Sequence, residues 1–149
     1  MTASDAQGPV LLCYDGSEGA GRAIRAAAAL LGAGLPARLF YVFKSTERSL
    51  GVAQGITGGR IDAPVVGQTE ATALVERGVA LAREAGFEAE PMLVAADRKT
   101  AEIIVATAEE LDAPAIVMGQ RGHSNLQSAF LGSVSRDVAN SQHRPIILV

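Results

Sequence analysis

The chain has 149 residues, of which 48% are hydrophobic, and a formal net charge of −3. This length is enough for one domain that buries about two-thirds of its unfolded surface. No block of Lys or Arg suits nucleic acid or an anionic membrane, and aromatic residues make up only 4% of the chain, so neither partner is expected.

The residues with special chemistry are few. Residues 1–8 are mostly small or polar and lack the apolar core of a signal peptide, so we expect a frayed end. A single Cys13 cannot form an internal disulfide, which fits a reducing compartment, and cytoplasm is the expectation. The two histidines, His123 and His143, are far apart in sequence, and Cys13 lies in an apolar run. A zinc site is therefore not expected.

The chain opens with a strand and a helix. Residues 10–14, Val-Leu-Leu-Cys-Tyr, are typical of a buried strand. The turn at 15–18, Asp-Gly-Ser-Glu, supplies oxygens that can cap a helix and an acid for its first turn. Apolar residues over 20–31 then recur with helical spacing, which predicts an amphipathic helix against a sheet. A second strand is predicted over 37–43.

Periodicity disappears between Lys44 and Gly67, a segment rich in glycine. A loop this long inside a compact domain is usually functional or disordered. One interpretation is a mobile surface insertion. The other is a lid that closes over a ligand at the sheet edge, because the second predicted strand leads directly into this segment.

The second half of the chain alternates helices and strands. The predicted elements are a helix opened by Glu70 and stopped by Gly86, a strand over 89–95, a helix that Thr100 caps, a strand over 115–118, a helix over 133–141 and a strand over 146–149. The order βαβ, loop, αβαβαβ indicates a single α/β domain over residues 1–149. Its open sheet would have five parallel strands and helices on both faces.

A glycine-rich loop joins the fourth predicted strand to the last helix. Gly119, Gly122 and Gly132 lie in it, and Ser133 and Ser135 follow at the start of the helix. Glycine allows positive φ and lets a ligand approach the bare backbone. The first amides of a helix have no internal partner, and the helix dipole makes that end positive. Together these features predict a phosphate-binding cradle.

The spacing of this loop differs from the two commonest phosphate motifs. A Walker A loop ends in Gly-Lys-Ser/Thr, and the chain has no Gly-Lys pair. The dinucleotide fingerprint, Gly-x-Gly-x-x-Gly, does not follow the first strand. The alternative to a phosphate role is that the glycines only allow a tight connection and close packing. Two hydroxyls at the helix start exceed what a plain connection requires.

The observed spacing, G-x2-G-x9-G-S, resembles the ATP-binding branch of the universal stress protein family. The Val-Met pair before the loop, the Ile-Ile-Leu-Val run at 146–149 and the strand and turn at 10–17 are also similar to that family. The resemblance implies a Rossmann-like fold of the adenine nucleotide alpha hydrolase type, with strand order 3-2-1-4-5. In that order Asp15 and Gly119 flank one crevice at the carboxyl ends of the strands.

The resemblance also implies which residues contact the nucleotide. Cys13, Val42 and Met118 would frame the purine, and the backbone of Val42 would meet the adenine edge. Arg121 and His123 are loop residues that can contact phosphate. The phosphates and ribose would be held, largely through backbone amides and with help from the serine hydroxyls, by Gly119, Gly122, Gly132, Ser133, Val134 and Ser135.

Asp15 is open to two interpretations that do not exclude each other. It can cap the helix that follows it. A carboxylate that faces phosphate needs a cation between them, so Asp15 can instead meet ribose hydroxyls or a Mg²⁺ ion held with the phosphates.

The resemblance therefore implies an ATP-binding, nucleotide-dependent switch in a stress response, with Mg²⁺ bound. No catalytic residue is expected, because no general base is evident. The resemblance also implies a homodimer joined through the last strand, 145–149, and the switch would act on an unknown protein partner. Two alternatives are slow ATP hydrolysis in the same crevice and a nucleotide-free interaction module. The intact glycine motif argues against the second alternative.

Overall fold

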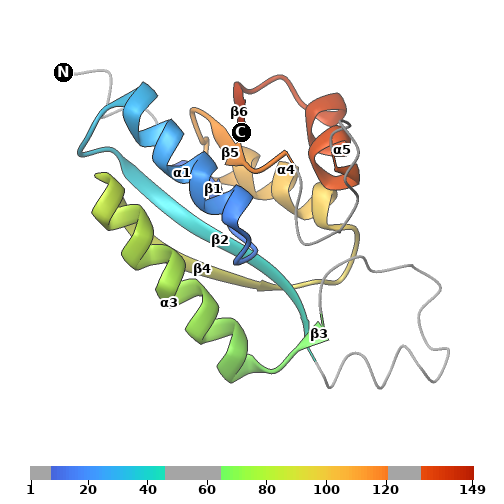
Figure 1. Ribbon diagram of the computed structural model, residues 1–149. Helices are drawn as coiled ribbons and strands as arrows, with labels where there is room; N and C mark the ends of the chain where they lie inside the picture. The colour runs from blue at the N-terminus through green and yellow to red at the C-terminus, as the bar shows by residue number, and fades with distance from the viewer. Residues whose placement is uncertain (1–7, 46–64, 121–131) are drawn as a thin grey trace, which may run out of the picture.

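The computed structural model describes residues 8–45, 65–120 and 132–149. It contains a parallel β-sheet with helices on both faces (Figure 1). The strands are β1 (Val10–Cys13), β2 (Pro36–Ser45), β3 (Val65–Val66), β4 (Glu88–Ala95), β5 (Ile116–Met118) and β6 (Ile146–Leu148). The helices are α1 (Glu18–Leu31), α3 (Gln68–Ala85), α4 (Thr100–Glu110) and α5 (Ser133–Ser141).

The strand order confirms the prediction. Five of the strands run in the order β4-β2-β1-β5-β6, which is the predicted order 3-2-1-4-5 once the two-residue β3 is set aside. β1 pairs with β2 as far as Cys13↔Phe40 and with β5 through Leu12↔Val117. The ends of β1 and β5 therefore lie side by side at the centre of the sheet.

Two hydrophobic cores fill the spaces between the sheet and its helices. α1 and α3 cover the near face in Figure 1, and α4 and α5 cover the far face. Successive strand residues point to opposite faces, so Leu12 and Leu39 pack against α1 and α3, while Leu11 and Phe40 pack against α4 and α5. Full burial of one such side chain contributes about 1.5–3 kcal/mol to stability.

The start of α1 shows which residue caps it. Ser17 is the N-cap, and its hydroxyl oxygen accepts a hydrogen bond from the Ala20 amide at 3.1 Å. The prediction that Asp15 itself caps the helix is wrong in detail, because its carboxylate accepts instead from the Ser17 amide at 2.9 Å. At the other end Leu31, predicted to face the sheet, is 38% exposed.

The remaining boundaries differ by a few residues from the prediction. α3 begins at Gln68 rather than Glu70, and the Glu70 carboxylate accepts from the Gly67 amide at 3.4 Å. The prediction that Thr100 caps α4 is wrong: Lys99 occupies the N-cap and makes no side-chain capping bond, and Thr100 is the first helical residue.

The segment predicted as a loop over 44–67 begins and ends in strand. β2 continues to Ser45, and β3 pairs with it through Lys44↔Val65. Residues 46–64, which carry the lid hypothesis, lie outside the described residues, as do residues 1–7 of the predicted frayed end. Gly8 is tied to the fold, because its amide donates to the Asp112 carbonyl at 3.1 Å. Among the described helices, none combines the length and apolarity needed to cross a bilayer.

Candidate functional site

The candidate site lies at the carboxyl ends of β1 and β5, where the order of the strands reverses. From β1 the chain passes to β2 and β4 on one side of the sheet, whereas β5 and β6 lie on the other side. Open parallel sheets bind their ligands outside the carboxyl ends of the strands at such a point. Asp15 follows β1 and Gly119 follows β5 directly, so the structure brings these two predicted site residues to the same edge.

Gly119 packs closely against the first turn of α1. A β-carbon at this position would lie 3.0 Å from the Gly19 carbonyl carbon and 3.1 Å from the Ala20 nitrogen. Both atoms belong to backbone, which cannot swing aside as a flexible side chain can. Close packing is therefore sufficient to explain a glycine here, and this contact favours the packing interpretation for Gly119.

The first turn of α5 is tied to the chain that leaves β5. The Gly132 amide donates to the Gln120 carbonyl at 2.7 Å, and the Gln120 amide donates to the Val149 carbonyl at 3.0 Å. The buried hydroxyl of Ser135 donates to the Gly119 carbonyl at 3.0 Å. These bonds fix the start of α5 relative to both β5 and β6.

The N-terminus of α5 has no side-chain cap. Gly132 occupies the N-cap, and the first intrahelical bond runs from the Arg136 amide to the Gly132 carbonyl. The amides of Ser133, Val134 and Ser135 come before that bond. Within the described parts of the chain, none of the three donates to a carbonyl or to a capping side chain. They are placed as an anion-binding helix end requires.

The other three described helices each have an acid in the first turn. The first turns of α1, α3 and α4 contain Glu18, Glu70 and Glu102, whereas the first turn of α5 contains no acid. A carboxylate there complements the positive end of the helix dipole. Of the four, α5 is therefore the helix whose positive end is not offset by an acid of its own first turn.

Asp15 is half-buried just after β1, and its charge acts on two neighbouring groups, Cys13 and Tyr41. Burial first, and the nearby Asp15 carboxylate second, raise the pKa of the Cys13 thiol to about 12. Burial also raises the pKa of the Tyr41 hydroxyl, with smaller contributions from Asp15 and Glu70. Cys13 therefore remains a neutral thiol at physiological pH and is unsuited to act as a nucleophile.

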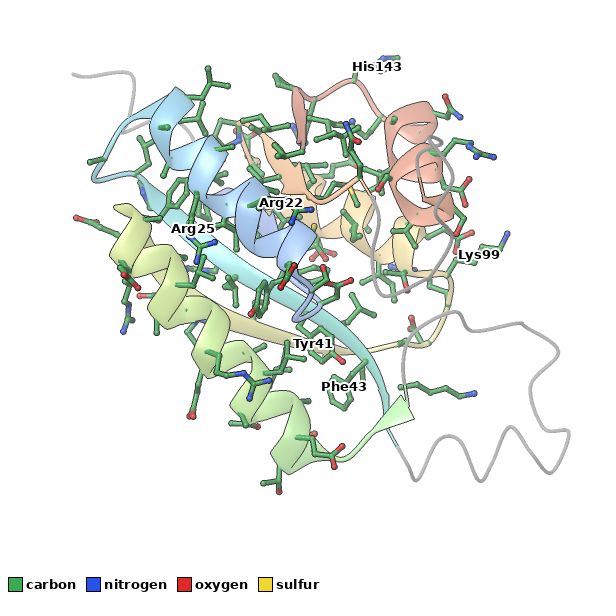
Figure 2. All side chains as sticks on the ribbon, in the orientation of Figure 1. Arg22, Arg25, Tyr41, Phe43, Lys99 and His143 are labelled. Atoms are coloured by element: carbon green, nitrogen blue, oxygen red, sulfur yellow. The ribbon has the colours of Figure 1, made fainter. Side chains whose placement is uncertain are left out.

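Tyr41 is a neighbour of the site that the sequence analysis did not identify. It lies on β2 facing α3, where its ring stacks on that of Phe43 with centroids 6.2 Å apart (Figure 2). The sequence could have indicated this position through strand alternation, because a Val42 side chain on one face of the sheet places the Tyr41 side chain on the other face.

The three predicted purine-framing residues share one face of the sheet. Cys13, Val42 and Met118 all pack into the core beneath α4 and α5, and the last two are only 6% and 5% exposed. Their side chains are thus largely used in packing. The Phe40 carbonyl accepts a hydrogen bond from the Tyr14 amide, so it points toward the β1 side of β2. The amide and carbonyl of Val42, two residues further along β2, point to that side too, but they lie beyond the last β1–β2 pair.

Three predicted site residues cannot be placed. Arg121, Gly122 and His123 lie outside the described residues. The other histidine, His143, immediately precedes the segment that enters β6 and lies at the amino end of the sheet (Figure 2). Within the described residues, no group of three or more His, Cys, Asp or Glu side chains is arranged to hold a metal ion.

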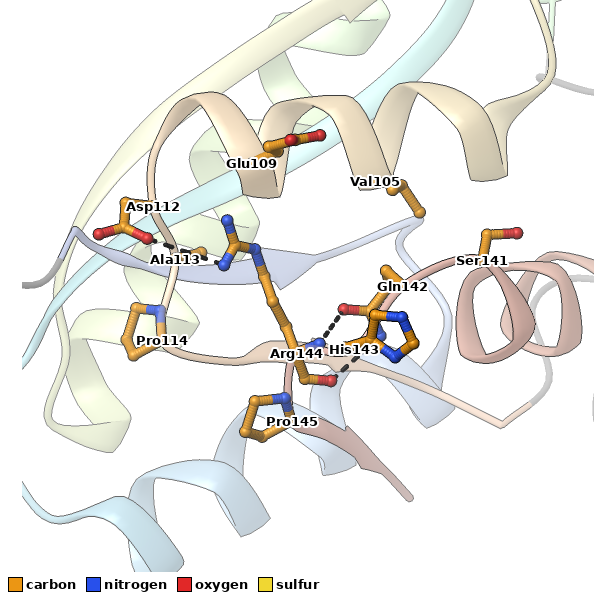
Figure 3. Close-up of a pocket in the computed structure, with 10 residues that line it drawn as sticks. All are labelled: Val105, Glu109, Asp112, Ala113, Pro114, Ser141, Gln142, His143, Arg144 and Pro145. Carbon is orange, nitrogen blue, oxygen red and sulfur yellow. Dashed lines mark hydrogen bonds and ion pairs between the residues drawn. The ribbon is translucent and has the colours of Figure 1, made fainter.

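A cavity of about 570 Å³ lies at the opposite edge of the sheet (Figure 3). Arg144 lines this cavity, and its guanidinium group lies 3.7 Å from the Asp112 carboxylate. The backbone of Arg144 forms hydrogen bonds with the side-chain amide of Gln142. Pro114 and Pro145, which precede β5 and β6, place the cavity at the amino ends of the strands. This is the wrong edge for the ligand site of an open parallel sheet.

The sequence profile of the universal stress protein family matches residues 8–149. The chain belongs to the universal stress protein family. Solved structures of relatives agree with the strand order and the helix positions described above.

A universal stress protein from Archaeoglobus fulgidus is 28% identical, with 95% of this chain and 97% of that chain covered at a TM-score of 0.70. The structure of the universal stress protein from A. fulgidus in complex with dAMP has a chain that is 27% identical in sequence. The match covers 95% of this chain and 96% of that chain at a TM-score of 0.66. A universal stress family protein from Burkholderia pseudomallei, 19% identical, shares the fold over 100% of this chain and 98% of its own, at a TM-score of 0.61. The comparison with curated proteins found no match.

Proposed function

We propose that this universal stress protein binds ATP at the carboxyl ends of β1 and β5, with the phosphates on the N-terminus of α5. The observation that carries the proposal is the set of three amides, Ser133 to Ser135, that follow the uncapped Gly132. Family membership supports it, as does the 27% identical A. fulgidus protein, whose structure holds dAMP.

The helix end alone is too weak to hold the nucleotide. A helix N-terminus contributes about 0.3–1 kcal/mol to the binding of an anion, and up to ~2 kcal/mol where it is partly buried. A micromolar dissociation constant corresponds to about 8 kcal/mol. Burial of roughly 150–200 Å² of purine surface would supply about 4–5 kcal/mol. The purine therefore provides most of the affinity, and the α5 end selects for phosphate.

The backbone of Val42 is the group best placed to read the adenine. Its amide and carbonyl lie beyond the paired part of β1, whereas its side chain is buried in the core. Cys13 and Met118 would line the floor below the base. The adenine would thus be recognised by main-chain groups, and the side chains would set only the shape of the pocket.

Asp15 fits a Mg²⁺ ion held jointly with phosphate. Mg²⁺ in nucleotide sites uses one or two carboxylates together with phosphate oxygens and water. Asp15 offers one carboxylate, and one of its oxygens accepts a hydrogen bond from the Ser17 amide. The ion would neutralise the repulsion between this carboxylate and the phosphates.

The switch would act in the cytoplasm as a homodimer joined through residues 145–149. β6 is an edge strand that ends in an apolar run, and such edges pair readily with a second chain. The bond from the Gln120 amide to the Val149 carbonyl connects this edge to the start of α5. A nucleotide that orders the start of α5 would therefore also order the dimer edge.

Substitution of Gly132 tests the phosphate site. Gly132 has φ −61° and ψ 157°, an extended conformation that any residue can adopt, so Gly132→Val should fold. Its side chain would enter the phosphate path and abolish ATP binding in calorimetry. Gly132→Asp would supply a cap for the free amides and a negative charge, so the unfolding temperature should hold while ATP binding is lost.

Gly67→Asp is the matched control, because Gly67 is the glycine N-cap of α3 and has open space around it. It adds the same charge at another helix N-terminus and should leave ATP affinity unchanged. Equal ATP affinity in folded Gly132→Val and wild type would refute the site. Mass spectrometry of the nucleotide that co-purifies with the native protein would identify the ligand independently.

A further inference from the structure

Ser135 is the only one of the three serines in α5 whose side chain is buried, with 4% of the residue exposed. Its hydroxyl lies 3.0 Å from the Gly119 carbonyl oxygen and 3.4 Å from that of Gln120. Ser133 in the same turn is exposed, and so is Ser141 in the last turn. The Ser135 hydroxyl therefore points at the end of β5 and not at solvent.

In this geometry the Ser135 hydroxyl already donates a hydrogen bond within the protein and does not donate one to phosphate. A serine hydroxyl has one proton to donate, and here it goes to Gly119 at the shorter distance. A phosphate oxygen is an acceptor and would have to take that proton away from Gly119. The backbone amide of Ser135, in contrast, is one of the three without a partner among the described residues.

We propose that Ser135 is a positioning residue, whose hydroxyl aims the amides of the first turn of α5 at the phosphates by anchoring that turn to Gly119. This inference rests on the proposed ATP site and assigns a different role to one of its residues. The Gly132–Gln120 bond holds the other side of the same turn. With both bonds present, the amides of Ser133 to Ser135 are oriented before the ligand arrives, and little ordering cost falls on binding.

Ser135→Ala tests the proposal, with ATP and adenosine compared in each variant. Adenosine shares the purine and ribose contacts but has no phosphate. Loss of the anchor should lower ATP affinity about tenfold, equivalent to about 1.4 kcal/mol, and leave adenosine affinity within about twofold. Calorimetry measures ATP binding, and chemical-shift titration measures the weaker binding of adenosine.

Three further variants sharpen the result. Ser135→Thr keeps the hydroxyl and should restore ATP affinity. Ser135→Cys replaces the hydroxyl with a slightly larger thiol that donates only weakly, so it should behave like Ser135→Ala and replaces that variant if the alanine protein does not fold. Ser141→Ala removes a hydroxyl that bonds the Asp137 carbonyl at the far end of α5, and should change neither affinity.

The amide resonance of Gln120 provides a readout without ligand. This amide is part of the same peptide group as the Gly119 carbonyl, so loss of the Ser135 bond should shift it, and Ser135→Thr should restore it. Equal losses of ATP and adenosine affinity, or no loss of either, would overturn the positioning role. Failure of the wild type to bind ATP would overturn the proposed function itself. The Gln120 shift is measured without ligand, so it tests the contact between Ser135 and Gly119 separately from ATP binding.

Discussion

Gly119→Ala separates the two explanations for the glycine that ends β5. The added β-carbon would lie 3.0 Å from the Gly19 carbonyl carbon, 3.1 Å from the Ala20 nitrogen and 3.3 Å from the Gly19 carbonyl oxygen. Ordinary contacts begin near 3.4 Å, so the first turn of α1 must retreat by a few tenths of an ångström. Overpacking of this kind costs about 1–3 kcal/mol.

The packing explanation predicts that this cost appears without nucleotide. In a chain of this size, 1 kcal/mol lowers the unfolding temperature by about 2–4 °C, so Gly119→Ala should unfold several degrees below wild type in the absence of ligand. Urea denaturation should give a lower midpoint with an unchanged slope. Gly67→Ala is the control, because its β-carbon would meet nothing within 4 Å.

One other outcome would support only the explanation that Gly119 allows phosphate to approach the backbone. If Gly119→Ala unfolds at the wild-type temperature without ligand but binds ATP more weakly, the glycine serves the approach of the nucleotide and the packing argument is wrong. If both quantities fall, the contact with α1 also positions the site. Equal stability and equal affinity would show that α1 adjusts without cost.

Two further predictions concern the cores on either side of the sheet. Gly78→Ala would place its β-carbon against the buried Leu39 and 2.6 Å from the Tyr14 ring, so it should destabilise the fold by about 1–3 kcal/mol. Gly21→Ala, with only an ordinary contact at 3.4 Å, should instead stabilise by up to about 1 kcal/mol through helix propensity; equal unfolding temperatures would contradict the comparison. Because burial holds the Cys13 thiol neutral, its contribution to stability is complete below pH 9.0, the ordinary pKa, and is lost as the pH approaches about 12. Thiol labelling at pH 8 should therefore be slower in native than in urea-unfolded protein, and native labelling at the unfolded rate would contradict the raised pKa.

The fold was predictable because apolar periodicity and turn residues agree along the described chain. The apolar run at 10–14 alternates between two cores, and the Asp-Gly-Ser-Glu turn forms the cap of α1, as the sequence indicates. The strand order itself came from the family resemblance, because periodicity identifies elements but not their neighbours. β3 was missed because two residues carry no period.

The sequence places the candidate site at the start of the last helix, but it says less about the role of each side chain there. The spacing of glycines and serines indicates a helix start after β5, and α5 begins at Ser133 as expected. Which atom each group faces depends on contacts between distant segments. Only the structure shows that Gly119 packs on α1 and that the Ser135 hydroxyl bonds the Gly119 carbonyl.

The electrostatics of the carboxyl edge are the reason why we assign phosphate to one helix end among the four that begin there. Each described helix follows a strand, so α1, α3, α4 and α5 all begin at this edge and all direct a positive end toward it. Glu18, Glu70 and Glu102 offset three of those ends and would repel phosphate. The fourth helix, α5, has Gly132 as its N-cap, which has no side chain to occupy the free amides. An anion that reaches this edge therefore meets one helix end that is both unblocked by a side chain and free of a first-turn acid. That end is joined to β5 by the Ser135 hydroxyl.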